Sequence, residues 1–420
     1  MKSGYGRIDI TPPIGLEMCG YGMYLERMAE GTLDPLYARC VVIDSGDRRA
    51  ILLSLDLVAL DVYTGLAVRD RLAAQFGTTA DLVMIAGTHT HSGPCTWTLR
   101  GWGAPDAAYN ASLPDLFAQA VHLAIDDLAP STIAAGAAPV EPIGFNRVGI
   151  KTEDIDREVR TVRLIRDNGD IVIANHSCHA VTLGVNKEWS ADYPGGVCRY
   201  LDGQEAHGVF FNGCCGDIDP IINQVKWGSG TMATVEEYGR TIGAVALAIG
   251  EGEAPAEPIA LRGASMLIDL PLVPTPRAEV EAALATSSAA YAKDPKDSGA
   301  RFEEDWATEC LTTIDAGRAP TSTPFPIQAI DLGPAILVSL GGEIFFDVAK
   351  QIWAAYPGKL ILPIGYGTGA VGYIPGPEDF EKGGYAAAFV PKIKGIFPFT
   401  PDVASRVAQG AIKTIAQAVG

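Results

Sequence analysis

The chain has 420 residues, of which 48% are hydrophobic and 20% charged, and its mean hydropathy is +0.15. This apolar content suffices for a large core and excludes an intrinsically disordered chain. Lys and Arg total 32 against 50 Asp and Glu, a net charge of −18, which argues against nucleic-acid and membrane partners because both attract basic patches.

The sequence predicts alternating strands and helices along its whole length. In chain order we expect strands at 39–43 and 50–57, a helix at 62–75, a strand at 82–86, a helix at 116–128, a hairpin of strands 159–165 and 171–175, a strand at 209–211, a helix at 231–249, a strand at 265–272, a helix at 278–293, strands at 328–332, 336–340 and 360–363, and a helix at 403–419. The predicted fold class is α/β, with mixed β-sheets layered between flanking helices. We expect a single large domain over residues 1–420, with an internal linker near 251–258.

We base the expected cellular location of the protein on the targeting signals that we do not find in the sequence. No stretch approaches the roughly 18 consecutive apolar residues of a membrane span, and the N-terminus has no apolar signal region. The eight cysteines contain no CxxC pair, which is typical of reduced thiols. We therefore expect a cytoplasmic protein, and the sequence leaves open whether it forms a homo-oligomer.

Four of the six histidines fall in two tight pairs. His89 and His91 follow a predicted buried strand, and residues two apart in an extended chain share a face, so both rings should reach one metal or one substrate. His176 and His179 are three apart, so at most one of them should join the first pair. The other would be a structural histidine.

Further polar residues follow other predicted strands. Asp217 and Asp219 lie in a Gly-rich segment after 209–211, and Glu343 follows 336–340. Residues Gly365–Ala370 look like a dinucleotide-binding fingerprint, but prolines follow where that motif needs a helix, so we discount nicotinamide binding.

These motifs, in this order, resemble the catalytic domain of the neutral (non-lysosomal) ceramidases. The matching blocks run from about residue 4 to 390 and comprise Gly6–Pro13 with Gly20-Tyr21-Gly22, Thr88–Pro94, Asn146-Arg147, His179, Gly216–Pro220, Gly342-Glu343 and Gly372-Tyr373-Ile374. The resemblance implies one Zn²⁺ per chain, bound by His89, His179, Glu343 and Tyr373. It also implies that His91, Arg147 and Tyr385 face the substrate. Iron or manganese stays open, because such ligands also bind these metals.

One residue departs from the family pattern at the reaction centre. Asp219 stands where the family motif carries a serine, proposed as its nucleophile. We also find neither the secretion signal nor the C-terminal immunoglobulin-like domain of true ceramidases. We therefore expect that ceramide is not the substrate and that Asp219 acts as a general base or grips a substrate group.

The aromatic residues Trp97, Trp102, Trp189 and Tyr193 lie near the histidine motifs, and we expect them to stack on a ring or sugar. The leading hypothesis is a zinc-dependent hydrolase, an amidohydrolase of a small polar molecule that cleaves a non-peptide amide. The alternatives are hydrolysis of a glycosidic or ester bond, and a metal-containing binding protein without catalysis.

Overall fold

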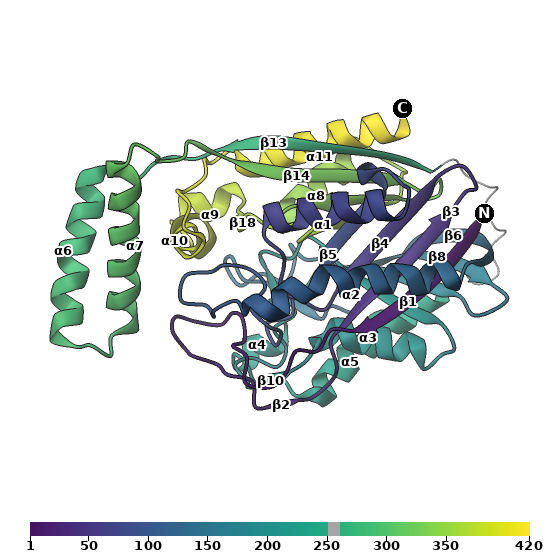
Figure 1. Cartoon of the computed structure of the whole chain (residues 1–420), viewed down its shortest axis with the longest axis horizontal. Coiled ribbons are helices and arrows are strands. Elements are labelled where there is room, and N and C mark those ends of the chain that lie inside the picture. Colours follow the sequence, from purple (N-terminus) through teal and green to yellow (C-terminus); the bar gives the residue numbers. More distant parts are fainter. Residues whose placement is uncertain (251–260) are drawn as a thin grey trace.

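The computed structural model describes residues 1–250 and 261–420, and Figure 1 shows two sheets between layers of helices. The larger sheet has eight strands in the order β11-β9-β8-β6-β1-β3-β4-β5. Their bounds are β1 Lys2–Asp9, β3 Tyr37–Asp44, β4 Arg49–Leu55, β5 Val83–Gly87, β6 Ala129–Pro139, β8 Glu158–Arg166, β9 Ile171–His176 and β11 His207–Asn212. The pairs β4/β5 and β9/β11 are parallel, and the other neighbours are antiparallel.

The second sheet has four strands in the order β13-β14-β15-β17. It comprises β13 Arg262–Pro271, β14 Ser322–Asp331, β15 Ile336–Leu340 and β17 Ile361–Ile364, of which β15 and β17 are parallel. Three two-stranded ribbons complete the strands: β2 Gly31–Thr32 with β10 Glu188–Trp189, β7 Gly144–Asn146 with β12 Ile218–Pro220, and β16 Glu343–Ile344 with β18 Tyr373–Ile374.

The helices cover the outer faces of the two sheets. The described helices are α1 Val62–Gln75, η1 Ala80–Leu82, α2 Ala107–Asp126, α3 Asp192–Asp202, α4 Ile222–Val225, α5 Met232–Ala248, α6 Arg277–Lys293, α7 Ser298–Asp315, α8 Phe346–Ala355, α9 Pro377–Glu381, η2 Tyr385–Phe389, α10 Val390–Lys394 and α11 Val403–Val419. Among them, none is long and apolar enough to cross a membrane. Helices α6 and α7 form an antiparallel hairpin that projects from the left of the view in Figure 1.

Strand β9 shows how the layers share one core. Ile171 and Ile173 pack toward the second sheet, where they meet residues such as Leu337 of β15. The alternating residues Val172 and Ala174 point to the other face, where they join the cluster that contains α3 and α5. Because both faces of the strand are covered, all six of its residues are buried, as expected for a strand between two apolar layers.

The predicted fold class is confirmed. Helices 62–75 and 403–419 begin and end where the pattern predicts, and β8 and β9 form the predicted hairpin. The helix predicted at 116–128 begins nine residues earlier, at Ala107, because Asp106 caps it there and it continues through Pro114. The predicted linker near 251–258 lies outside the described residues, and a single domain over residues 1–420 stays a prediction.

Glycines at the start of the chain bring α2 close to one face of β1. A Cβ atom on Gly6 would lie 2.1 Å from the carbonyl oxygen of Ala120 in α2, and one on Gly4 would lie 1.9 Å from that of Ala124. No side chain fits at such distances, so the helix and the strand would have to separate.

We predict that Gly6→Ala lowers the free energy of unfolding by roughly 1–3 kcal/mol, because α2 must shift to relieve the overlap. Gly299→Ala in α7 is the matched control, since its Cβ would meet only the Asp297 side chain at 3.3 Å. Urea unfolding measures both variants, and equal stability of Gly6→Ala and wild type would contradict this account of the packing.

Candidate metal centre

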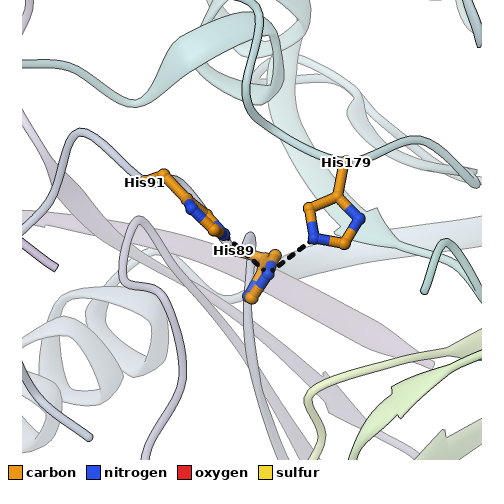
Figure 2. Close-up of side chains that lie close together, drawn as sticks. All are labelled: His89, His91 and His179. Carbon is orange, nitrogen blue, oxygen red and sulfur yellow. Dashed lines mark hydrogen bonds between the residues drawn. The ribbon is translucent and has the colours of Figure 1, made fainter. Parts of the chain in front are cut away.

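Three imidazole rings point toward one another at one end of the two sheets (Figure 2). The His89 Nε2 atom lies 3.0 Å from His91 Nε2 and 3.1 Å from His179 Nε2. The predicted convergence of His89, His91 and one histidine of the second pair is therefore observed. The expected reason for it, an extended chain in which residues two apart share a face, does not hold. His89 lies beyond the end of β5 and has a φ of 67°, a left-handed conformation that is rare for a residue with a side chain.

Hydrogen bonds at Nδ1 set the tautomer of His89 and of His179, and so determine what each Nε2 presents to the cluster. His89 Nδ1 is 2.8 Å from the carbonyl oxygen of Val58, and His179 Nδ1 is 2.9 Å from that of Cys215. A carbonyl oxygen only accepts, so each Nδ1 carries the hydrogen and donates it. Each Nε2 therefore presents a lone pair to the shared space, which is the arrangement found in histidine ligands of metals.

A carboxylate and a phenol complete the group of donors. Glu343 Oε2 lies 3.2 Å from His89 Nε2 and 3.4 Å from His179 Nε2, and it is buried without a hydrogen-bond partner among the described residues. Tyr373 Oη lies 3.3 Å from His179 Nε2. Pairing of β16 with β18 sets Glu343 directly beside Tyr373. Ligands 2.0–2.1 Å from a tetrahedral metal are about 3.3 Å apart, so these spacings suit a metal ion.

The Glu343 carboxylate needs a balancing positive charge, which either a proton on His179 or a metal ion can supply. Burial lowers the pKa of His89 and His91, so both rings are neutral. Burial also acts to lower the pKa of His179, but its contacts with Cys215 and Glu343 outweigh burial and raise that pKa to about 10. Without a metal, a proton on His179 balances the Glu343 carboxylate, and a divalent ion could take its place.

A pocket of about 400 Å³ opens beside the cluster, with His91, His179 and Tyr373 in its wall. Arg147 and Asp219 line it as well, and their side chains pair at 3.3 Å. The other end of the Arg147 guanidinium donates to Tyr373 Oη at 2.7 Å and to the carbonyl oxygen of Gly216 at 2.6 Å. Asp219 Oδ1 is 4.0 Å from His179 Nδ1, and Arg147, Asp219, His179 and Tyr373 all line this one pocket.

Tyr385, which the resemblance assigns to the substrate, lies at the rim of this pocket and is 47% exposed. Sequence reasoning missed other pocket residues, among them Tyr21 and Trp227, whose rings lie 5.3 Å apart edge to face. Tyr21 stands in the segment Gly20-Tyr21-Gly22 that carries part of the family resemblance, so a signal for it existed. Trp227 follows α4 in a segment without any motif.

The four aromatic residues predicted to stack on a substrate divide into two pairs. Trp102 lines the pocket, and Trp97 lines a smaller cavity beside the metal cluster. Trp189 and Tyr193 are completely buried, and the Tyr193 hydroxyl donates to the carbonyl oxygen of Cys178. Stacking on a substrate does not fit Trp189 and Tyr193, because both are core residues that line neither cavity.

His176 and the cysteines lie outside the group of donors. His176 is not part of the histidine cluster, and its Nδ1 is 3.0 Å from the carbonyl oxygen of Glu158, which suits a structural histidine. All eight cysteines are free and buried. The segment after β17 continues as a loop to Tyr373 rather than as a helix, in agreement with the discounted dinucleotide fingerprint.

Asp217 has a different place from Asp219, although the two are separated by a single residue. It is buried and accepts hydrogen bonds from the backbone N–H of Phe346, the first residue of α8, and from the Asn146 side chain, both at 2.7 Å. Asp217 therefore caps the start of α8. Burial raises its pKa to about 6.

Comparison with known proteins confirms the family resemblance. Residues 2–151 match the family model described as neutral/alkaline non-lysosomal ceramidase, N-terminal. Neutral ceramidase 3 of Arabidopsis thaliana is 28% identical over 186 residues, 39% of this chain and 25% of that relative. The neutral ceramidase of Pseudomonas aeruginosa is 27% identical over 272 residues, 58% of this chain and 40% of that relative. The matched segments thus span less than half of either relative.

Two solved structures have the same fold. The crystal structure of the neutral ceramidase from Pseudomonas aeruginosa superposes with a TM-score of 0.76 at 19% identity, covering all of this chain and 74% of that one. A ceramidase complexed with C2 gives a TM-score of 0.75 at 17% identity and covers 75% of that chain. At this identity the superposition establishes the fold alone.

We predict that Asp217 makes the protein less stable as the pH rises from about 4 to 6.5. Its pKa is higher in the folded chain than in the unfolded chain, so the folded state holds the extra proton in this range and loses stability when the proton leaves. The change amounts to roughly 3 kcal/mol. Urea unfolding of wild type and Asp217→Asn at several pH values measures it, and a stability difference that is independent of pH would contradict this role.

Proposed function

Since the chain is a relative of the neutral ceramidases, we propose that it is a zinc-dependent hydrolase of a small polar soluble molecule, most simply a non-peptide amide. The observation that carries this proposal is the convergence of three imidazole nitrogens and one unpartnered carboxylate oxygen beside a pocket whose wall contains His91 and His179. A pocket of about 400 Å³ is at the lower end of the range for small-molecule sites.

The residues present fit the metal that the family implies. His89, His179 and Glu343 would hold it, Tyr373 would be a weak fourth ligand that can yield to substrate, and His91, 3.0 Å from His89 Nε2, would face the substrate. Two imidazoles and a carboxylate with room for one more group are typical of catalytic zinc sites. When bound, the ion would polarise a carbonyl group and lower the pKa of a water molecule.

The neighbouring side chains have complementary roles in hydrolysis. The oxygen of the attacking water bonds to the amide carbon, and the Asp219 carboxylate accepts a proton from that water. Arg147, already paired with Asp219 and Tyr373, donates hydrogen bonds to the carbonyl oxygen as negative charge develops there. The carbon–nitrogen bond then breaks, and Asp219 returns the proton to the departing amine. A carboxylic acid and an amine are the products.

Asp219 is also the reason to propose a substrate other than ceramide. Because it stands where the family motif has a serine, no serine hydroxyl is available there as a nucleophile. The alternative of a sugar substrate has lost part of its support, because Trp189 and Tyr193 are buried in the core. A non-peptide amide therefore remains the simplest class of substrate to propose for this site.

We predict that His89→Ala abolishes both bound metal and activity and leaves the fold intact. The cluster is a small part of a core built from many other contacts, so the protein does not need the ion to fold. Elemental analysis of the purified variant measures the metal, and circular dichroism checks the fold.

His176→Ala is the matched control, a buried histidine three residues from His179 that should keep one metal per chain. An unchanged metal content in His89→Ala would refute the ligand assignment. Loss of metal in His176→Ala would reverse the choice between the two histidines of the second pair.

We predict that Asp219→Asn lowers kcat by roughly 10²–10⁴ with little change in KM, because the amide keeps the shape of the side chain but cannot accept the proton. The substrate is found first with a panel of amides, esters, aryl glycosides and a short-chain ceramide, each run beside a metal-stripped sample. Asp217→Asn is the control and should change stability more than kcat.

Three outcomes would change the proposal. A higher KM with a nearly unchanged kcat in Asp219→Asn would make this residue a substrate-binding group. Full activity in that variant would move the base to His91. Strong release of fatty acid from the ceramide, above the metal-stripped sample, would overturn the choice of substrate.

A further inference from the structure

A second, smaller cavity lies beside the cluster formed by His89, His91, His179 and Glu343, and below we call this group the metal cluster. It has a volume of about 40 Å³ and shares Tyr373, Trp102 and His91 with the larger pocket. Apart from Lys394, Tyr385 and the histidine, carboxylate and phenol side chains of the candidate metal site, its wall is apolar. We call it the side cavity and define it by Val58, Trp97, Leu99, Ile393 and Lys394.

Lys394 is the unusual member of this wall. It is the last residue of α10, where Gly395 with φ of 66° ends the helix. Its ammonium group lies 4.2 Å from the centre of the Trp97 ring and donates one hydrogen bond, to the carbonyl oxygen of Thr98 at 3.1 Å. Within residues 1–250 and 261–420, no carboxylate oxygen comes within 4.0 Å of this ammonium group.

A cation in apolar surroundings without a carboxylate is costly unless another group compensates it. Burial lowers the pKa of Lys394 to about 8, against weaker opposite effects of Asp61 and Glu343. The amine is therefore still mostly protonated at neutral pH. The contrast with Arg147 is clear, because that cation on the other side of the cluster is paired with Asp219.

The neighbouring backbone leaves room for this lysine. A Cβ atom on Gly372 would lie 3.1 Å from Lys394 Cγ, closer than most such contacts, and Gly372 has a φ of 124°. Gly372 directly precedes Tyr373, so the loop that supplies this metal-binding phenol also provides the space for the lysine side chain. The partly buried lysine side chain thus packs against the loop that carries Tyr373.

We propose that Lys394 binds a carboxylate at the end of a short acyl group, so that the substrate is a half-amide of a short dicarboxylic acid. The inference rests on the proposed function, because it places the amide carbonyl at the metal cluster and the carboxylate end of the acyl chain in the side cavity. A water molecule needs about 10–15 Å³ measured in the same way, so the cavity holds about three water-sized groups. That is the size of a carboxylate group, so the one or two methylene groups that precede it must lie where the side cavity meets the larger pocket, at the shared residues His91, Trp102 and Tyr373.

The experiment compares N-succinyl-p-nitroanilide with N-butyryl-p-nitroanilide, which has the same chain length and no charge. We expect wild-type protein to favour the succinyl substrate roughly 10–100-fold in kcat/KM, the effect of a hydrogen-bonded ion pair. In Lys394→Met, which keeps the length of the side chain, this ratio should fall to near one. Lys413→Met removes an exposed lysine on α11 and should keep the wild-type ratio.

Isothermal titration calorimetry with succinate and butyrate tests the cavity independently of catalysis. Tighter binding of succinate that is lost in Lys394→Met supports the inference even if neither anilide is cleaved, in which case only the proposed function fails. Equal binding of the two acids to wild-type protein, or a preference for succinate that survives in Lys394→Met, would overturn it.

Discussion

The carboxylate of Glu343 is the group on which the rest of the site depends. It is buried, one of its oxygens has no hydrogen-bond partner among the described residues, and two imidazoles lie within 3.4 Å of that oxygen. An unbalanced charge in such surroundings would cost several kcal/mol. The pKa of His89 is lowered and that of His179 is raised, so His89 stays neutral while His179 takes up the proton that balances the carboxylate. A divalent ion satisfies this carboxylate and both lone pairs at once.

The two sheets are arranged so that loops from both reach this point. His89 follows β5 of the larger sheet, whereas Glu343 follows β15 of the smaller one. The segment after β17 links the two sheets, because Thr368 N–H donates to Ile85 of β5, Gly365 N–H donates to Asn212 of β11, and Tyr366 N–H donates to Gly342, the residue before Glu343. These bonds fix the strand ends that carry His89 and Glu343 relative to one another, as a metal site would require. The pocket and the side cavity then lie on either side of one fixed centre.

Much of this site could be predicted from the sequence, because most of the side chains that form it lie in short local motifs. The spacing of His89 and His91 and the position of Glu343 after a strand are visible in the chain itself. Long-range contacts carry the rest. Lys394 enters the site from a short helix near the end of the chain, and its role depends on Trp97, almost 300 residues earlier in the sequence. The burial of Tyr193 depends on α3, a Gly-containing helix that the sequence pattern did not predict.

The most direct test of the central claim is a crystal structure of zinc-loaded protein with anomalous data collected on both sides of the zinc absorption edge. The account predicts one strong peak per chain, at about 2.0–2.2 Å from His89 Nε2, His179 Nε2 and Glu343 Oε2. A peak elsewhere in the molecule, or none at these three atoms, would contradict it.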